Sequence, residues 1–200
     1  MKNEINRIAG RLVKAFNTNT VINPIPVKYC KNINLANKLR KLCEDQIKDE
    51  TIGIKAGGTG IQALKKLKEK EPFTAKVFKK RLVKSGQKVK INQHTKGIEV
   101  EVYYFIKKSF FDFKGKVTKS NVTKFIKFMG PCFEIVGFRQ RNKKFTYLGD
   151  ICGDFGFNIK FVVGRKTKFK KLNLNNLRTS LVSKKNGVKV NGHTNICLLY

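Results

Sequence analysis

Two glutamates stand two positions apart in an apolar segment of a chain that has few acidic residues. Glu99 and Glu101 lie in GIEVEVYYFI (97–106), whereas the whole chain has 13 Asp and Glu against 44 Lys and Arg. Alternating polar and apolar residues are typical of a β-strand, in which residues i and i+2 point to the same face. Two carboxylates roughly 7 Å apart on a partly buried face repel each other. A bound cation would remove this cost, and carboxylate oxygens suit Mg²⁺, Mn²⁺ or Ca²⁺.

A third carboxylate is available in a later apolar segment. Glu134 is the only acidic residue of PCFEIVGF (131–138), so it is the natural candidate for a third ligand from a neighbouring strand. The alternative is a solvent-facing strand on which Glu99 and Glu101 keep the surface polar. Tyr103 and Phe105 continue the same face and argue against a fully solvated surface, but the pattern alone leaves both interpretations open.

The elements that position these residues begin with helices. Residues 1–16 have apolar side chains at the spacing of one helix face, namely Ile5, Ile8, Ala9, Leu12, Val13 and Phe16. A connector with Pro24 and Pro26 precedes a second predicted helix over about 34–49, with an inner face of Leu35, Leu39, Leu42, Cys43 and Ile47.

The remainder of the chain is predicted to be rich in β-structure. A short strand ending in glycines is expected in 51–60, and a short helical or irregular piece in 61–70. Later strands are expected at VKIN (89–92), 98–106, 132–138, 158–164 and 195–200. A third helix is predicted over 120–129, with Ser120 as its N-cap and Val122, Phe125, Ile126 and Met129 facing inward. Asn186-Gly187 predicts a two-residue hairpin.

Together these elements predict an α+β fold in a single domain over 1–200. A helical region (1–50) comes first, and a β-rich region (51–200) that carries the candidate chemistry follows it.

The net charge of +31 suggests nucleic-acid binding, but the composition weakens that interpretation. Eight of the basic residues are Arg and 36 are Lys, and they are spread from end to end. Base recognition and bidentate phosphate contacts favour Arg. We therefore expect a solvated basic surface rather than a nucleic-acid interface.

Other functional classes find little support in the residues. Five scattered cysteines without a C-x-x-C pair predict free thiols rather than disulfides or a zinc site. His94 and His193 are the only histidines, and each is expected in a surface loop. No apolar run reaches transmembrane length, so a cytoplasmic protein without a membrane partner is expected.

Four segments resemble the 2-oxopent-4-enoate hydratases of the fumarylacetoacetate hydrolase superfamily. They are GIKAGGT (53–59), EPF (71–73), IEVEVYYF (98–105) and FEIVGFR (133–139), and they occur in the family's order. The segments 149–164 and 186–192 are similar to the family's later strands. The resemblance implies a mixed sheet or roll that continues beyond the strand at 195–200, so the chain is expected to be truncated at its C-terminus relative to the family.

The resemblance also implies a set of site residues. The family's metal ligands fall on Glu99, Glu101 and Glu134, and the ion would be Mg²⁺ or Mn²⁺. Lys55 falls close to the substrate. Arg139 is expected either to act in catalysis as a second anion clamp or to form a buried structural ion pair.

The activity implied is that of a metal-dependent hydratase, a carbon–oxygen lyase. It would add water to a 2-oxo-4-enoic acid such as 2-hydroxypenta-2,4-dienoate in the breakdown of aromatic compounds, within a homo-oligomer. Within the superfamily the alternatives are a decarboxylase of 2-oxo diacids and a C–C hydrolase of acylpyruvates. From other classes, a basic nucleic-acid-binding protein and an inactive truncated relic remain open.

Overall fold

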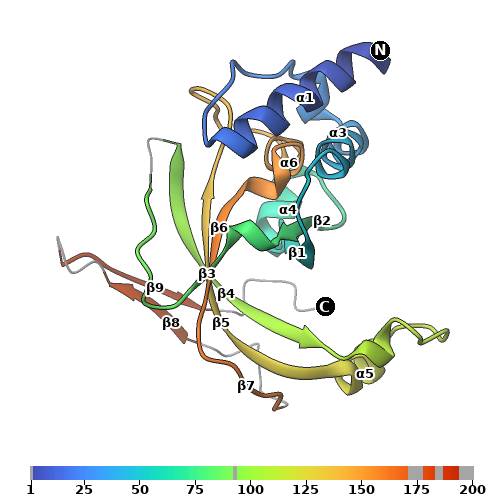
Figure 1. Ribbon diagram of the computed structural model, residues 1–200, viewed down its shortest axis with the longest axis vertical. Coiled ribbons are helices and arrows are strands. Elements are labelled where there is room, and N and C mark those ends of the chain that lie inside the picture. Colours follow the sequence, from blue (N-terminus) through green and yellow to red (C-terminus); the bar gives the residue numbers. More distant parts are fainter. Residues whose placement is uncertain (1, 92–93, 171–177, 183–186, 194–200) are drawn as a thin grey trace.

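Most of the helices gather over one end of a twisted sheet in the computed structural model, and one short helix lies near the other end (Figure 1). Residues 2–91, 94–170, 178–182 and 187–193 are described by the structure. The predicted α+β fold is confirmed, with helices first and a mixed sheet after them.

The N-terminal helices form the main apolar core. These N-terminal helices are α1 (Lys2–Thr18), α2 (Lys28–Lys31) and α3 (Ile33–Asp45). Three shorter helices follow later in the chain, namely α4 (Ile61–Leu67), α5 (Lys119–Val122) and α6 (Leu148–Cys152). The predicted inner face of α1 is buried, and Ile8, Leu12 and Phe16 pack against Leu39 and Cys43 of α3 in one cluster. Burying each large aliphatic or aromatic side chain contributes about 1.5–3 kcal/mol, so this cluster stabilises the fold.

The boundaries of α3 differ from the prediction. Asn32 caps the helix, since its side chain accepts hydrogen bonds from the backbone N–H of Asn34 and Leu35. The helix ends at Asp45 instead of 49, and Ile47 is buried beyond its end. The apolar spacing continued past the helix because a loop residue can also fill the core.

The large sheet has the strand order β3-β6-β5-β4, and β7 pairs with the far end of β5. Its strands are β3 (Leu82–Lys84), β4 (Thr95–Ile106), β5 (Ile126–Gly137), β6 (Asn158–Val163) and β7 (Thr167–Lys168). β3 is parallel to β6, and the other pairs are antiparallel. A separate antiparallel pair joins β1 (Thr51–Gly57) to β2 (Phe73–Phe78).

The predicted helix over 120–129 is wrong. A short helix covers Lys119–Val122, the cap is Thr118 rather than Ser120, and a 3₁₀ turn follows at Thr123–Phe125. The strand β5 then begins at Ile126, and Met129 pairs with Tyr104. Pairing with the twelve-residue strand β4 satisfies the backbone of this segment, and such tertiary pairing overrides a weak helical spacing.

The strand predicted at VKIN (89–92) is also absent, because Val89, Lys90 and Ile91 belong to no strand and residue 92 lies outside the described residues. The short strand β3, which the pattern did not predict, pairs with β6 instead.

The antiparallel pairing predicted near the C-terminus is confirmed for β8 (Arg178–Val182) and β9 (Lys189–His193), but Val182 pairs with Lys189, so the predicted two-residue turn at Asn186-Gly187 is not confirmed. Asn186 of the predicted turn and the segment 195–200, which includes Cys197, lie outside the described residues. Cys30, Cys43, Cys132 and Cys152 are free and buried, as predicted for these four. In the described part of the chain, no helix has both the length and the apolarity to cross a bilayer.

Candidate metal centre

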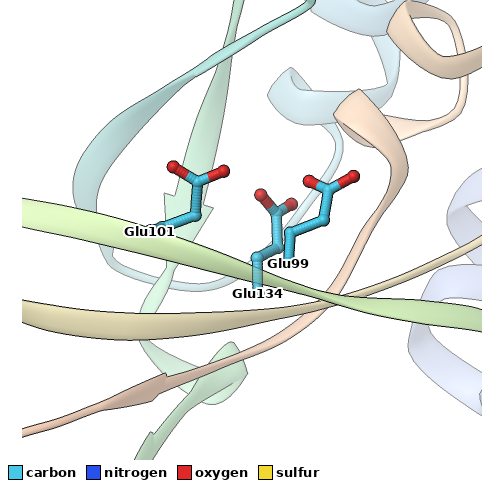
Figure 2. Close-up of side chains that lie close together, drawn as sticks. All are labelled: Glu99, Glu101 and Glu134. Carbon is cyan, nitrogen blue, oxygen red and sulfur yellow. The ribbon is translucent and has the colours of Figure 1, made fainter. Parts of the chain in front are cut away.

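The register of β4 against β5 brings the three predicted glutamates together. Glu99 lies directly opposite Glu134, and Glu101 follows two residues later on the same face of β4. Figure 2 shows the three side chains rising from the two strands toward the same side of the sheet. One carboxylate oxygen from each residue lies within 4.8 Å of those of the other two. The residues are therefore close enough to bind one ion.

The surroundings of Glu134 and Glu101 oppose the negative charge of their carboxylates. Glu134 is 2% exposed, and burial raises its pKa to about 7, with further upward contributions from Glu99 and Glu101 and an opposing effect of Lys55. Desolvation and then the charge of Glu99 raise the pKa of Glu101, although the side chain is exposed by area. The charge of Glu99 thus contributes to the raised pKa of both Glu101 and Glu134, which is the electrostatic cost of neighbouring carboxylates expected from the sequence.

Lys55 reaches this centre from β1. Its ammonium group lies 2.5 and 2.6 Å from the two oxygens of Glu134 and donates to the carbonyl oxygen of Gly156 at 3.0 Å. Both partners of the ion pair are largely buried, with side-chain exposures of 10% for Lys55 and 2% for Glu134. The β1–β2 pair thus places a positive charge over the acidic face of the large sheet.

The charges of these four groups suit a divalent cation. Three ionised carboxylates and one ammonium group leave a net charge of −2, which one divalent ion would neutralise. Oxygen atoms on opposite sides of Mg²⁺ are about 4.2 Å apart, and around Ca²⁺ they are about 5 Å apart. Because one oxygen from each glutamate lies within 4.8 Å of the other two, small side-chain rotations would bring all three to the distance of about 2.0–2.6 Å at which oxygens bind Mg²⁺ or Ca²⁺. The residues present therefore fit a divalent ion.

Arg139 forms a buried ion pair, which is one of the two roles expected for it from the sequence. Its guanidinium group lies 3.2 Å from Asp154 Oδ1 and also donates to the carbonyl oxygen of Asn158. The rings of Phe16 and Phe155 lie 4.8 and 5.1 Å from it. Among the described hydrogen bonds and ion pairs of Arg139, none involves a glutamate of the centre. Contact of Arg139 with a substrate stays a prediction.

The sequence analysis missed the backbone of Gly156 as a partner of Lys55. Gly156 has φ +67°, and a Cβ there would lie 2.7 Å from Ala75 Cβ and 3.2 Å from the ring of Phe73. Only glycine fits this close approach of the segment to β2 without strain. The signal available in the sequence was the glycine in GDFGFN (153–158), although nothing there indicates that its carbonyl group faces Lys55.

Two structures of one enzyme are among the solved structures that resemble this fold. They are 4-oxalocrotonate decarboxylase from Pseudomonas putida G7 complexed with magnesium and adipate, with a TM-score of 0.74, and the same enzyme complexed with calcium and acetate, with a TM-score of 0.76. In both comparisons the identity is 15% over 98% of this chain, which spans 76% and 75% of those chains. No protein-family model and no curated protein matches the chain. The comparisons therefore show that this chain shares the fold of 4-oxalocrotonate decarboxylase.

Proposed function

We propose that this chain is a metal-dependent enzyme that acts on 2-oxo acids, with Glu99, Glu101 and Glu134 as ligands of a divalent ion. The observation that carries the proposal is the convergence of these three carboxylates within 4.8 Å in a chain that is strongly basic elsewhere. Magnesium and calcium in the two structures of similar fold support a divalent ion, and Mn²⁺ is a second candidate. When bound, the ion would supply Lewis-acid stabilisation of negative charge on a substrate oxygen.

The reaction we propose first is hydration of a 2-oxo-4-enoic acid such as 2-hydroxypenta-2,4-dienoate. Ketonisation removes the proton of the C2 hydroxyl group, places a proton on C5 and leaves a double bond between C3 and C4. Water then adds its hydroxyl group to C4 and a proton to C3. Both proton transfers need a donor beside the substrate, and Lys55 is the buried ammonium group that the structure places at the centre.

Glu134 has a specific part in this arrangement. Its carboxylate holds the Lys55 ammonium group by both oxygens, so it orients the proton donor as well as facing the ion. The Gly156 carbonyl oxygen fixes the same ammonium group from another side. We propose that these two contacts position Lys55 and that Arg139 supports the fold around the centre through Asp154.

A second candidate is decarboxylation of a 2-oxo diacid. The two structures of similar fold favour it, because both are of a decarboxylase and one contains the diacid adipate. Loss of carbon dioxide leaves an electron pair that passes into an enolate, and protonation of that enolate at carbon again requires a donor such as Lys55. The same residues would therefore serve either reaction.

Turnover assays distinguish these reactions from each other and from a non-catalytic role. The chain is supplied with 5 mM MgCl₂ or with EDTA, and water addition to 2-hydroxypenta-2,4-dienoate is followed by loss of its ultraviolet absorbance. Carbon dioxide release from a 2-oxo-hexenedioic acid is measured in parallel. Activity that EDTA abolishes and Mg²⁺ restores is expected. No turnover of either substrate, with metal bound, would favour the inactive relic.

The nucleic-acid alternative makes a different prediction. Binding carried by basic side chains weakens steeply with salt. A titration of the chain against random duplex DNA at physiological ionic strength therefore tests the nucleic-acid alternative. If the chain is the proposed enzyme, we expect no appreciable DNA binding under these conditions.

We also propose that residues 1–200 form one domain and that the protein is a homo-oligomer. Arg139 of the β-rich region packs on Phe16 of the helical region, which supports one folding unit. On the sheet face opposite the glutamates, apolar side chains are exposed, namely Ile98, Val100, Tyr104 and Phe133. Light scattering coupled to size-exclusion chromatography tests the oligomeric state.

A further inference from the structure

A second charged site lies at the beginning of β4, and its charge is opposite to that of the metal centre. A pocket of about 470 Å³ opens there between the start of β4 and the segment after β5. Small-molecule sites have volumes of about 300–1,000 Å³, so this pocket has room for a small ligand. Its lining includes three basic side chains, those of His94, Lys96 and Arg141, and none of its described lining residues is acidic.

The floor of the pocket is held in place by buried contacts. Phe138 and Gln140 are each 3% exposed, and the Phe138 ring packs on Phe157 with centroids 4.6 Å apart. The side-chain oxygen of Gln140 accepts the backbone N–H of Ile25 at 3.0 Å, and its amide nitrogen donates to Asp154 at 3.2 Å. A ligand would therefore meet a floor that is already ordered, which lowers the entropic cost of binding.

The rim of the pocket concentrates positive charge without compensation. Neither Lys96 nor Arg141 forms an ion pair with a described residue. Desolvation lowers the pKa of His94, and the charges of Lys96 and Arg141 lower it further, so both cations act on the same space. Asn142, with φ +53°, adds an amide group at the rim. An anion would relieve the repulsion between these cations.

We propose that this pocket binds a small anion bearing a phosphate or carboxylate group. Arg141 would bind the anionic group through its planar fork of donors, and Lys96 would add a second charge-assisted hydrogen bond. Val21 and Phe138 would contact an apolar part of the ligand. Lys96 precedes Glu99 by three residues, or about 10 Å along β4, so the anion site is separate from the metal centre. The inference does not depend on the proposed enzymatic function.

Calorimetric titration of the full chain with inorganic phosphate, and separately with succinate, tests the proposal. The titrations are run at pH 7.0 with 150 mM NaCl, to screen the general positive field, and with EDTA to remove divalent ions. We expect one saturable site for at least one of the two anions, and the tighter anion identifies the ligand class. Saturation by neither anion up to 20 mM would overturn the proposal.

Variants separate this pocket from the rest of the basic surface. Arg141→Gln and Lys96→Gln should each weaken binding at least tenfold, whereas Lys114→Gln, at an exposed lysine near α5, should change it less than twofold. Glu101→Gln should also bind the anion as the parent does, because that change affects only the metal centre. Since Lys96 and Arg141 are exposed, these variants should retain the parent melting temperature. Equal weakening by Lys114→Gln and Arg141→Gln would show a diffuse charge effect and refute a specific pocket.

Discussion

The ion pair between Lys55 and Glu134 yields the most informative stability prediction. In the Lys55→Met variant the ammonium group is lost, and Glu134 stays buried opposite Glu99 without its cation. Removing one partner of a buried ion pair costs about 3–5 kcal/mol when the remaining group stays charged. Glu134 can become neutral instead, because its pKa of about 7 allows it to take up a proton near neutral pH.

The size of the effect follows from that proton. At pH 7.5, keeping a carboxyl group neutral costs about 4 kcal/mol relative to an unfolded chain in which its pKa is about 4.5. The parent already bears most of this cost, since raising the pKa to about 7 corresponds to roughly 3 kcal/mol. The charge effect of the substitution is therefore below about 1 kcal/mol, and the lost hydrogen bond to Gly156 adds about 1 kcal/mol.

We therefore expect Lys55→Met to lower the free energy of unfolding by about 2 kcal/mol in EDTA at pH 7.5, which lowers the melting temperature by roughly 4–8 °C. A carboxyl pKa that is raised in the folded protein costs stability only at pH values above the pKa of the same group in the unfolded chain. The difference in unfolding free energy between Lys55→Met and the parent should therefore shrink toward pH 5. Saturating Mg²⁺ should close the part of the gap that comes from charge, up to about 1 kcal/mol, because the ion replaces the missing positive charge but not the hydrogen bond to Gly156. The assay is urea unfolding followed by circular dichroism, with and without Mg²⁺.

The Arg139→Met variant is the matched control, because it breaks another buried ion pair that lies outside the metal centre. The free energy of unfolding of Arg139→Met should be about 3–5 kcal/mol below that of the parent. Mg²⁺ should stabilise this variant and the parent by the same amount, so the difference between them should not change. If Mg²⁺ left the difference between Lys55→Met and the parent unchanged, the reasoning that Lys55 and the ion share Glu134 would be wrong.

Further predictions concern pH, the glycine beside Lys55, a helix cap and the core. Mg²⁺ affinity should fall about tenfold from pH 8 to pH 6, since Glu134 with a pKa of about 7 must lose its proton to bind the ion; calorimetry showing a flat profile would contradict this. Gly156→Ala should destabilise the chain by about 2–3 kcal/mol in urea unfolding, because φ is +67° and the new Cβ would overlap Ala75. Thr118→Ala should cost about 1 kcal/mol through loss of the α5 capping box, and an unchanged unfolding midpoint would refute that role. Phe16→Ala should cost about 3–5 kcal/mol, measured in the same way, because Phe16 lies in the main core.

The parts of the fold that were predicted correctly are those with a strong local signal. α1 repeats apolar residues at helical spacing over four turns, and β4 alternates over much of its length, so each could be read without knowledge of its partners. β3 has three residues, too few to show any period. The segment 120–129 fits helical spacing throughout, but from Ile126 onward it pairs with β4, and only this tertiary partner decides between helix and strand.

The candidate centre shows the same division. The scarcity of acidic residues singled out Glu99, Glu101 and Glu134, whose types indicate their chemistry. The contact of Lys55 with Glu134 joins positions 79 residues apart, and the partner at Gly156 is a backbone oxygen that any residue possesses. Register and backbone direction determine these contacts, and neither can be read from residue types alone.

Calorimetric titration of the full chain with Mg²⁺ at pH 8 tests most directly whether the three carboxylates bind one ion. We predict one site per chain in the parent and at least tenfold weaker binding in Glu101→Gln and Glu99→Gln. Glu71→Gln, which changes an exposed glutamate away from the centre, should bind as the parent does. Equal Mg²⁺ affinity in the parent and the Glu101→Gln variant would contradict the metal centre.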